Sequence, residues 1–226
     1  MVDVYAISID EEISGEKLNK LLSAISEEKR ERISCFRFKR DILRSMYGEL
    51  LVRYIVSKRK RIDFDDIKFV YNTYGKPYIK DISDLYFNVS HSGKWVACAF
   101  GQMEVGIDIE LIRDIDIEIA RDFLAPPEYD SLMKRTDYAR LEYFYDLWTL
   151  KESYIKWTGK GLSIPLSSFR IVQCNSSSEI RVFNNEKVRL KQFLLDKEYK
   201  MSVCSEESCI NEPVILSADF IENVTG

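Results

Sequence analysis

Residues 105–110 read Val-Gly-Ile-Asp-Ile-Glu, a pattern that predicts a β-strand with two chemically different faces. Residues two positions apart in a strand point to the same side. Asp108 and Glu110 therefore share one face, and the two isoleucines share the other, which points toward a core. We expect Gly106, on the acidic face, to leave room for the close approach of a ligand. An edge strand with two solvated acids would give the same pattern.

Residues 148–156 read Trp-Thr-Leu-Lys-Glu-Ser-Tyr-Ile-Lys and belong to a predicted helix over 139–157. Glu152 falls within the apolar stripe of that helix, four residues after Trp148 and three before Ile155. A carboxylate that faces a core is costly unless it is paired or binds a metal. A salt bridge to Lys156 is the alternative, but it would leave Glu152 on the apolar face.

Three carboxylates thus become candidate metal ligands, namely Asp108, Glu110 and Glu152. Oxygen ligands without cysteine or histidine suit a hard cation, and Mg²⁺ commonly combines a few protein carboxylates with substrate phosphates. Lys151 flanks the apolar stripe of the same helix, where it could reach a neighbouring phosphate.

The order of predicted elements indicates an α+β protein with two similar halves, residues 1–103 and 104–226. Residues 2–9 form an inner strand because both of its faces are largely apolar. Helices are expected at 14–25, with Ser14 as the cap, and at 36–57, 115–124, 126–134 and 139–157. Strands are expected at 67–72, 85–90, 94–100, 104–110, 168–173, 180–184, 188–195, 199–205 and 213–217.

Composition places few limits on function but excludes some classes. The 226 residues are 46% hydrophobic and carry a net charge of −4, so nothing global indicates nucleic-acid binding. No apolar run approaches the ~20 residues of a membrane span. The start of the chain lacks the features of a signal peptide, and the cysteines are scattered, at positions 35, 98, 174, 204 and 209. We therefore expect reduced thiols and a cytoplasmic protein.

The charge is unevenly distributed. The window from Lys29 to Arg61 has a net charge of +9, which leaves −13 for the rest of the chain. A local basic surface on an acidic protein suggests a bound anion, although a solvated helix face would look the same. His91, the only histidine, follows a predicted strand in a polar loop, where it could bind a phosphate or act as a base.

The two motifs, in this order and spacing, resemble those of the Sfp-type 4′-phosphopantetheinyl transferases. The similarity extends through 26–30, the helix of Arg44, 74–77, 87–93 and 159–162. It implies that Mg²⁺ binds Asp108, Glu110 and Glu152. It also implies a coenzyme A site formed by Lys29, Arg32, Arg44, Gly75, Lys76, Pro77, Ser90, His91, Lys151 and Lys156. Arg32 stands where a lysine is more usual, which keeps the charge but changes the contact geometry.

The resemblance further implies a monomer with pseudo-twofold symmetry that transfers the phosphopantetheine arm of coenzyme A to a serine of an apo carrier protein. The by-product would be 3′,5′-ADP. We expect Glu152 to act as the general base, directly or through a metal-bound water, with His91 as second choice. The carrier is expected to dock beside Asp108 and Glu110, against residues 115–124. Peptide, polyketide, siderophore and fatty-acid pathways all remain open as its source.

Two alternatives come from other classes of protein. The basic window could bind nucleic acid, but it contains no aromatic stacking platform and no known nucleic-acid motif. A non-catalytic module could bind coenzyme A or phosphate without Mg²⁺-dependent transfer.

Overall fold

A computed structural model describes residues 1–9, 12–173 and 180–219. The elements before residue 104 are β1 (Asp3–Ser8), α1 (Gly15–Ser23), α2 (Glu27–Ser34), α3 (Lys39–Lys60), η1 (Phe64–Asp66), β2 (Phe69–Tyr71), β3 (Pro77–Ile79), β4 (Tyr86–Ser92) and β5 (Trp95–Gly101). They are followed by β6 (Val105–Leu111), η2 (Ile117–Ile119), α4 (Ala120–Phe123), α5 (Pro126–Met133), α6 (Asp137–Thr158), η3 (Gly161–Ser163), η4 (Leu166–Ser168), β7 (Ile171–Gln173), β8 (Ile180–Val182), β9 (Asn185–Phe193), β10 (Tyr199–Ser205) and β11 (Val214–Leu216).

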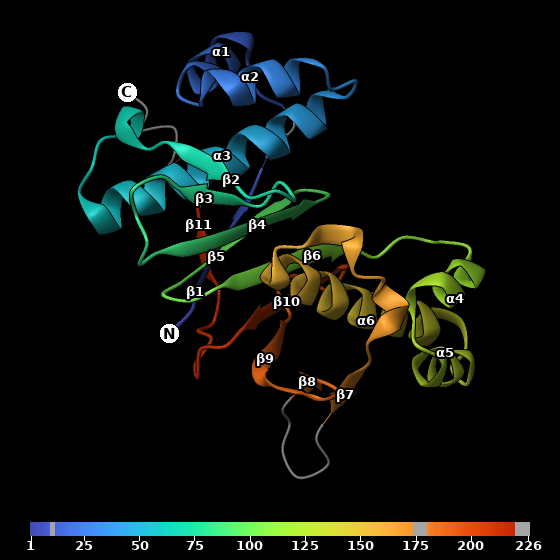
Figure 1. Ribbon diagram of the computed structural model, residues 1–226. Helices are drawn as coiled ribbons and strands as arrows, with labels where there is room; N and C mark the ends of the chain where they lie inside the picture. The colour runs from blue at the N-terminus through green and yellow to red at the C-terminus, as the bar shows by residue number, and fades with distance from the viewer. Residues whose placement is uncertain (10–11, 174–179, 220–226) are drawn as a thin grey trace.

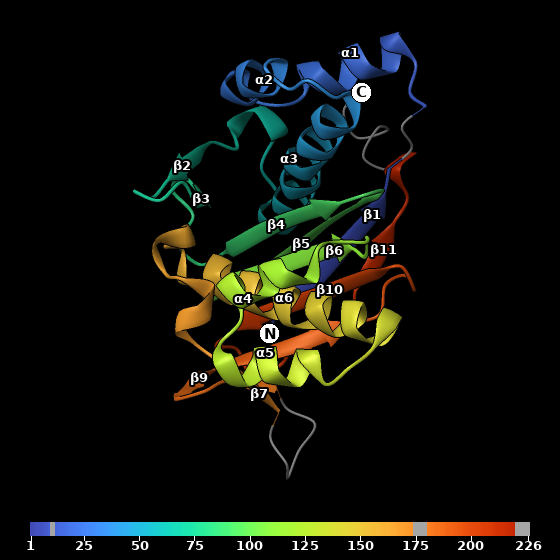
Figure 2. The same cartoon turned by 90° about the vertical axis from the view of Figure 1, so that its right-hand side faces the viewer.

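Two sheets pack face to face, with one long helix on the outer side of each (Figures 1 and 2). The first sheet has the order β11-β1-β5-β4, and the second has the order β6-β10-β9-β8-β7. Helix α3 packs on the first sheet and α6 on the second, while β2 and β3 form a separate hairpin. The predicted mixture of helix and sheet is confirmed. The division at residue 103 and the pseudo-twofold symmetry stay predictions.

Strand β5 shows why the sheets are layered in this way. All seven of its residues are buried. Trp95, Ala97 and Ala99 enter the core between the sheets, and the alternate residues enter the core beneath α3. The predicted inner strand at 2–9 is also confirmed, because β1 lies between β11 and β5. Strand β11 pairs with β1 in parallel, so the first sheet includes residues from near the end of the chain.

Several predicted boundaries need correction. The helix expected at 36–57 begins at Lys39, because Phe38 is still extended, and it ends at Lys60. The helix expected at 115–124 is wrong: those residues form only η2 and the four-residue α4. His91 belongs to strand β4 rather than to a loop. The cap at Ser14 is confirmed, since its side chain accepts a hydrogen bond from the backbone N–H of Lys17 at 3.2 Å.

Two features of the described residues bear on expectations from composition: the state of the cysteines and the hydropathy of the helices. Cys35, Cys98, Cys204 and Cys209 are unpaired, and Cys174 lies outside the described residues. None of the helices in the described part of the chain has the length and apolar character needed to cross a bilayer.

The two sheets are joined by side chains where β4 runs beside β6. Asn88, Ser90 and Ser92, on one face of β4, accept hydrogen bonds from alternate backbone N–H groups of β6. The distances are 2.9 Å from Ile107 N, 3.3 Å from Ile109 N and 3.1 Å from Leu111 N. This polar seam (Asn88, Ser90 and Ser92) takes the place of a backbone ladder, so each buried donor of β6 keeps a partner.

Helix α6 lies unusually close to β6 at Gly106. A Cβ atom at this position would lie 2.0 Å from Ser153 O and 2.4 Å from Trp157 N. The expectation that Gly106 makes room for a ligand is therefore wrong. The missing side chain makes room for the backbone of α6, which brings Glu152 opposite Asp108 and Glu110.

A buried ion pair fixes α6 on its other side. Lys151 Nζ lies 2.8 Å from Glu128 Oε2 in α5 and also donates to Leu166 O and Phe169 O, at 2.9 and 2.6 Å. Glu128 accepts hydrogen bonds from Ala125 N and Ile171 N, so both charged groups are fully engaged. The side chains of Lys151 and Glu128 are only 1% and 3% exposed.

Replacement of Gly106 by alanine should separate α6 from β6. We expect a loss of about 1–3 kcal/mol in the free energy of unfolding, because the new methyl group meets backbone that cannot rotate away. Denaturant unfolding with far-UV circular dichroism would measure this. Gly15→Ala is the matched control, since nothing lies within 4 Å of its added Cβ and its stability should stay within about 1 kcal/mol. Equal stability of both variants would contradict the close contact.

Replacement of Lys151 by methionine should destabilise the fold strongly. Loss of the ammonium leaves the Glu128 carboxylate buried without its charge partner, which costs about 3–5 kcal/mol. The same unfolding assay applies. Lys60→Met breaks a surface pair with Asp84, joined at 2.6 Å, and should leave the stability almost unchanged because solvent screens that pair. A comparable loss of unfolding free energy in the two variants would show that the buried ion pair of Lys151 does not stabilise the fold more than a surface pair does.

Candidate functional site

Two hollows meet at strand β4. The first, a cavity of about 210 Å³, is lined from α2, α3, the β2–β3 hairpin and β4. The second is an open depression of about 330 Å³ between β4, β6 and α6. Val89 and His91 line both hollows, so the two hollows adjoin at these residues. We call them the cationic cavity and the acidic depression, after the charged groups that they contain.

The acidic depression brings together all three candidate metal ligands. Its lining residues are Val89, Ser90, His91, Asp108, Glu110, Trp148, Glu152 and Lys156. Asp108 is 3% exposed. Its Oδ1 accepts hydrogen bonds from Ser90 Oγ at 3.0 Å and from Lys156 Nζ at 2.7 Å. Its Oδ2 is buried without a hydrogen-bond partner, which leaves one strong acceptor unsatisfied.

Burial and the negative charge of Asp108 raise the pKa values of the other two carboxylates. Burial, together with the charge of Asp108, raises the pKa of Glu110 to about 7, although Ser92 donates to its Oε2 at 2.7 Å. The same two causes raise the pKa of Glu152, and the charge of Lys156 opposes them. Repulsion among carboxylates in a half-buried hollow is relieved by a bound cation.

The oxygen donors of these residues suit a hard divalent cation, although the side chains are not arranged as a complete coordination shell. Within the described residues, no three histidine, cysteine or acidic side chains already converge as metal ligands would. The fit rests on the unpartnered Oδ2 of Asp108 and on the oxygen-only donor set.

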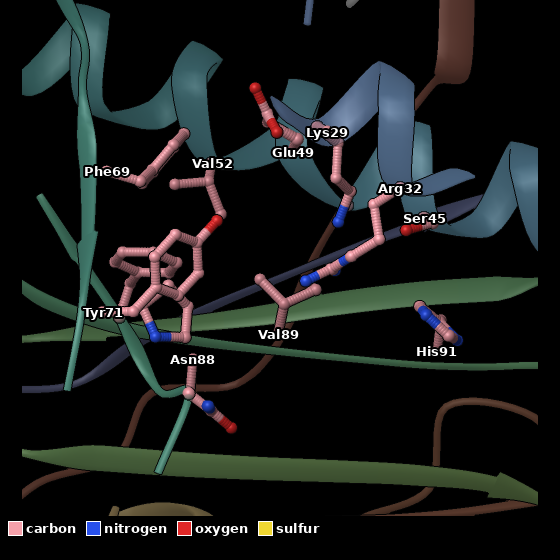
Figure 3. Close-up of a pocket in the computed structure, with 14 residues that line it drawn as sticks. Lys29, Arg32, Ser45, Glu49, Val52, Phe69, Tyr71, Asn88, Val89 and His91 are labelled. Atoms are coloured by element: carbon pink, nitrogen blue, oxygen red, sulfur yellow. The ribbon is translucent and has the colours of Figure 1, made fainter. Parts of the chain in front are cut away.

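Helix α2 supplies the charge of the cationic cavity. Lys29 and Arg32 extend from α2 toward β4, opposite Tyr71 and the hairpin, as Figure 3 shows. The start of α2 is held by Glu49 of α3, which accepts hydrogen bonds from Ser26 N at 2.7 Å and Ser26 Oγ at 3.1 Å. A buried carboxylate therefore fixes the helix that carries both cations.

Two groups in this region have shifted pKa values. Burial and the charge of Arg32 lower the pKa of Lys29 to about 8, and Glu49 opposes that shift. Loss of solvation, with the charges of Arg44 and Lys156, holds the pKa of His91 below its ordinary value. The imidazole of His91 is therefore neutral near pH 7, and it retains contact with solvent.

The structure brings most of the predicted binding residues to these hollows. Lys29, Arg32, Gly75, Pro77 and His91 line the cationic cavity, while Ser90, His91 and Lys156 line the acidic depression. Lys156 contacts Asp108 and Ser90 rather than pairing with Glu152 along the helix. Arg44 lies beside His91 and donates to Gly93 O at 3.3 Å without lining either hollow.

Two predicted phosphate ligands, Lys76 and Lys151, lie elsewhere. Lys151 is the buried partner of Glu128, so its ammonium is not available to a phosphate. The ammonium of Lys76 is also buried, and its contacts are with Glu104, Val105 and Trp157. Neither ammonium lines either hollow, and their expected role in binding coenzyme A stays a prediction.

The sequence also carried signals that were missed. Asn88, Ser90 and Ser92 alternate along one strand, a period-two polar pattern that indicates a shared face. Ser92 supports Glu110, and Asn88 lines the cationic cavity. Phe69 and Tyr71, which line the same cavity, carried no recognisable signal because their strand has only three residues.

Two family models together match most of the chain. A family model described as "4'-phosphopantetheinyl transferase, N-terminal" matches residues 12–102, and the model of the 4'-phosphopantetheinyl transferase superfamily matches residues 104–204. A solved holo-(acyl-carrier-protein) synthase from Bacillus anthracis, in complex with CoA (3',5'-ADP), is 16% identical with a TM-score of 0.39. That match covers 45% of this chain and 93% of the other.

Curated relatives are considerably more similar. The 4'-phosphopantetheinyl transferase Sfp of Bacillus subtilis is 39% identical over 98% of this chain and 96% of its own length. The 4'-phosphopantetheinyl transferase gsp of Aneurinibacillus migulanus is 38% identical over 91% of this chain and 86% of its own. On this similarity, and with both family models matched in order, the chain belongs to the 4′-phosphopantetheinyl transferase superfamily.

Proposed function

We propose that this transferase moves the 4′-phosphopantetheine arm of coenzyme A to a serine hydroxyl of an apo carrier protein, with Mg²⁺, and releases 3′,5′-ADP. One observation carries the proposal: a cavity with two cations adjoins a depression with three carboxylates, and His91 borders both. Coenzyme A carries groups that match both compartments. Its 3′-phosphate is an isolated dianion that suits the cations, and its pyrophosphate binds metal ions well, which suits the carboxylates.

Binding places the 3′-phosphate and the pyrophosphate of coenzyme A in different compartments. Lys29 and Arg32 hold the 3′-phosphate, and the hairpin wall that contains Tyr71 lies against the adenosine. Neutral His91 can donate a hydrogen bond to a phosphate oxygen at the border between the compartments. The pyrophosphate then lies over the acidic depression, where Lys156 offsets part of its charge.

A bound Mg²⁺, held by Asp108, Glu110 and Glu152, supplies charge neutralisation at the pyrophosphate as negative charge builds up on the leaving group. Lys156 contributes in the same direction, because its ammonium lies 2.7 Å from Asp108 at the border of the depression. Preorganised charges of this kind need little rearrangement during the reaction.

Transfer replaces the phosphoanhydride bond of the pyrophosphate by a phosphoester bond to serine. The serine Oγ attacks the phosphorus that bears pantetheine, and the bond from that phosphorus to the 5′-phosphate oxygen breaks. The electron pair leaves with 3′,5′-ADP. The serine proton passes to a base, for which Glu152 is the first choice and His91 the second, since both border the depression.

The carrier must approach the open side of the acidic depression. Part of the expected docking segment, 115–124, is not available for this contact. Leu124 is 2% exposed, whereas Phe123 is half-buried and its ring packs against Trp148 with 5.0 Å between ring centroids. Ile119, which is 40% exposed, remains an accessible apolar residue of the segment.

Asp108→Ala and Glu152→Ala should each reduce transfer by about 100-fold or more, because each removes charge stabilisation from the reacting centre. Mass spectrometry of apo carriers incubated with enzyme, coenzyme A and Mg²⁺ would show the added arm. Chelation of the metal should stop the wild-type reaction, and added Mg²⁺ should restore it. Asp84→Ala, an exposed acid outside both hollows, is the control and should retain normal turnover. Normal turnover of the Asp108 or Glu152 variant would refute the three-carboxylate site.

Binding of 3′,5′-ADP should weaken as the pH rises above about 8. Lys29 loses its proton near that pH in the free protein, whereas the bound phosphate favours the charged form. One coupled proton changes the affinity by up to about tenfold per pH unit. Calorimetric titration between about pH 7 and 9.5 would measure this slope. In Lys29→Arg the guanidinium stays charged throughout, so its affinity should be nearly constant. An equal decline in both proteins would assign the pH dependence to another group.

A further inference from the structure

Lys76 lies in the turn between β2 and β3, and its ammonium group points into the protein. Nζ lies 2.5 Å from Glu104 Oε2, 3.1 Å from Val105 O and 3.2 Å from Trp157 O. An ammonium group has three N–H donors, so these three acceptors use all of them. A phosphate could bind Lys76 only by displacing one of these contacts.

The three acceptors belong to the segments that carry the carboxylates. Glu104 and Val105 lie at the start of β6, and Trp157 is in the last turn of α6. Carbonyl groups in the last turn of a helix lack intrahelical partners and carry partial negative charge, so a cation is favourable there. Asn72 provides a second tie, because its Nδ2 donates to Gly159 O at 2.8 Å.

The hairpin that Lys76 fastens is also a wall of the cationic cavity. Phe69 and Tyr71 of β2 and Gly75 and Pro77 beside Lys76 all line that cavity. A shift of the hairpin would therefore move this wall relative to β6 and α6. Misplacement of a reacting group by about 1 Å can cost about 100-fold in rate.

The positive charge of Lys76 contributes to its ion pair with Glu104. Burial lowers the pKa of Lys76, and the hydrogen bond and charge of Glu104 oppose that shift. The other carboxylate oxygen of Glu104 accepts a hydrogen bond from Tyr78 Oη at 2.8 Å. Removal of the ammonium would take this donor from Val105 O and Trp157 O and leave Glu104 without its charged partner.

We propose that Lys76 is a positioning residue for phosphopantetheine transfer. It fastens the β2–β3 hairpin to β6 and α6, and thereby holds the nucleotide cavity in place over the carboxylates. It does not recognise the 3′-phosphate of coenzyme A, which falls to Lys29 and Arg32. This inference rests on the proposed function, and it assigns Lys76 an effect on the rate of transfer instead of on phosphate recognition.

The test compares Lys76→Met with Lys29→Met, which removes a lysine from the cavity itself. Calorimetry would give the affinities of each variant for coenzyme A and for dephospho-coenzyme A. For Lys76→Met the ratio of the two affinities should stay within about twofold of wild type, because both ligands lose the same positioning. For Lys29→Met the ratio should fall by about tenfold or more, as expected for loss of a charged phosphate contact.

The transfer reaction separates positioning from simple stabilisation. At a temperature well below the unfolding midpoint of the variant, Lys76→Met should lower kcat by about tenfold or more, whereas a residue that only stabilises the fold would leave kcat unchanged. If Lys76→Met fails to fold, Glu104→Gln provides the same test, since it keeps the size of the side chain and removes the charge partner. It should lower kcat and leave the affinity ratio unchanged.

Either of two results would overturn the inference. A loss of discrimination in Lys76→Met as large as in Lys29→Met would make Lys76 a phosphate ligand. An unchanged kcat in a folded Lys76→Met, or in Glu104→Gln, would exclude a positioning role. Failure of the proposed function is distinct, because wild-type protein would then transfer no arm to any apo carrier.

Discussion

The polar seam between β4 and β6 is the constraint on which the site depends. Each hydroxyl of the seam serves twice: Ser90 accepts from Ile109 N and donates to Asp108, while Ser92 accepts from Leu111 N and donates to Glu110. The contacts that join the two sheets therefore also orient two of the three carboxylates. Apolar residues in these positions would leave backbone donors of β6 unsatisfied and the carboxylates unsupported.

Strand β4 also lies between two clusters of charged side chains. The cations of α2 lie in one hollow and the carboxylates of β6 and α6 lie in the other, with Val89 and His91 between them. Partial burial disfavours the charged forms in each set, because it lowers the pKa of Lys29 and raises those of Glu110 and Glu152. Both sets are therefore stabilised by a ligand that brings the complementary charge to each hollow. Gly106 maintains the arrangement by allowing α6 to approach β6 closely.

The sequence predicted the mixed fold, most strands and the meeting of Asp108, Glu110 and Glu152, because strand and helix periodicity determine which residues share a face. It could not predict how close two elements approach, so the role of Gly106 was misread. It also placed Lys76 and Lys151 among the phosphate ligands. Their type and motif position suited that role, but acceptors distant in sequence, such as Glu128 and Trp157, enclose them. Contacts with residues distant in sequence produce no local sequence pattern from which the burial of these lysines could be predicted.

The pairing of β11 with β1 has a consequence for how the protein is made. Tyr5 lies opposite Val214 in this parallel pair, so the inner strand β1 is synthesised more than two hundred residues before its second neighbour. Contacts of such long sequence separation form slowly and late in folding. During synthesis, β1 therefore has one open edge until β11 leaves the ribosome. Over that interval the nascent chain exposes a strand edge that chaperones or aggregation could engage.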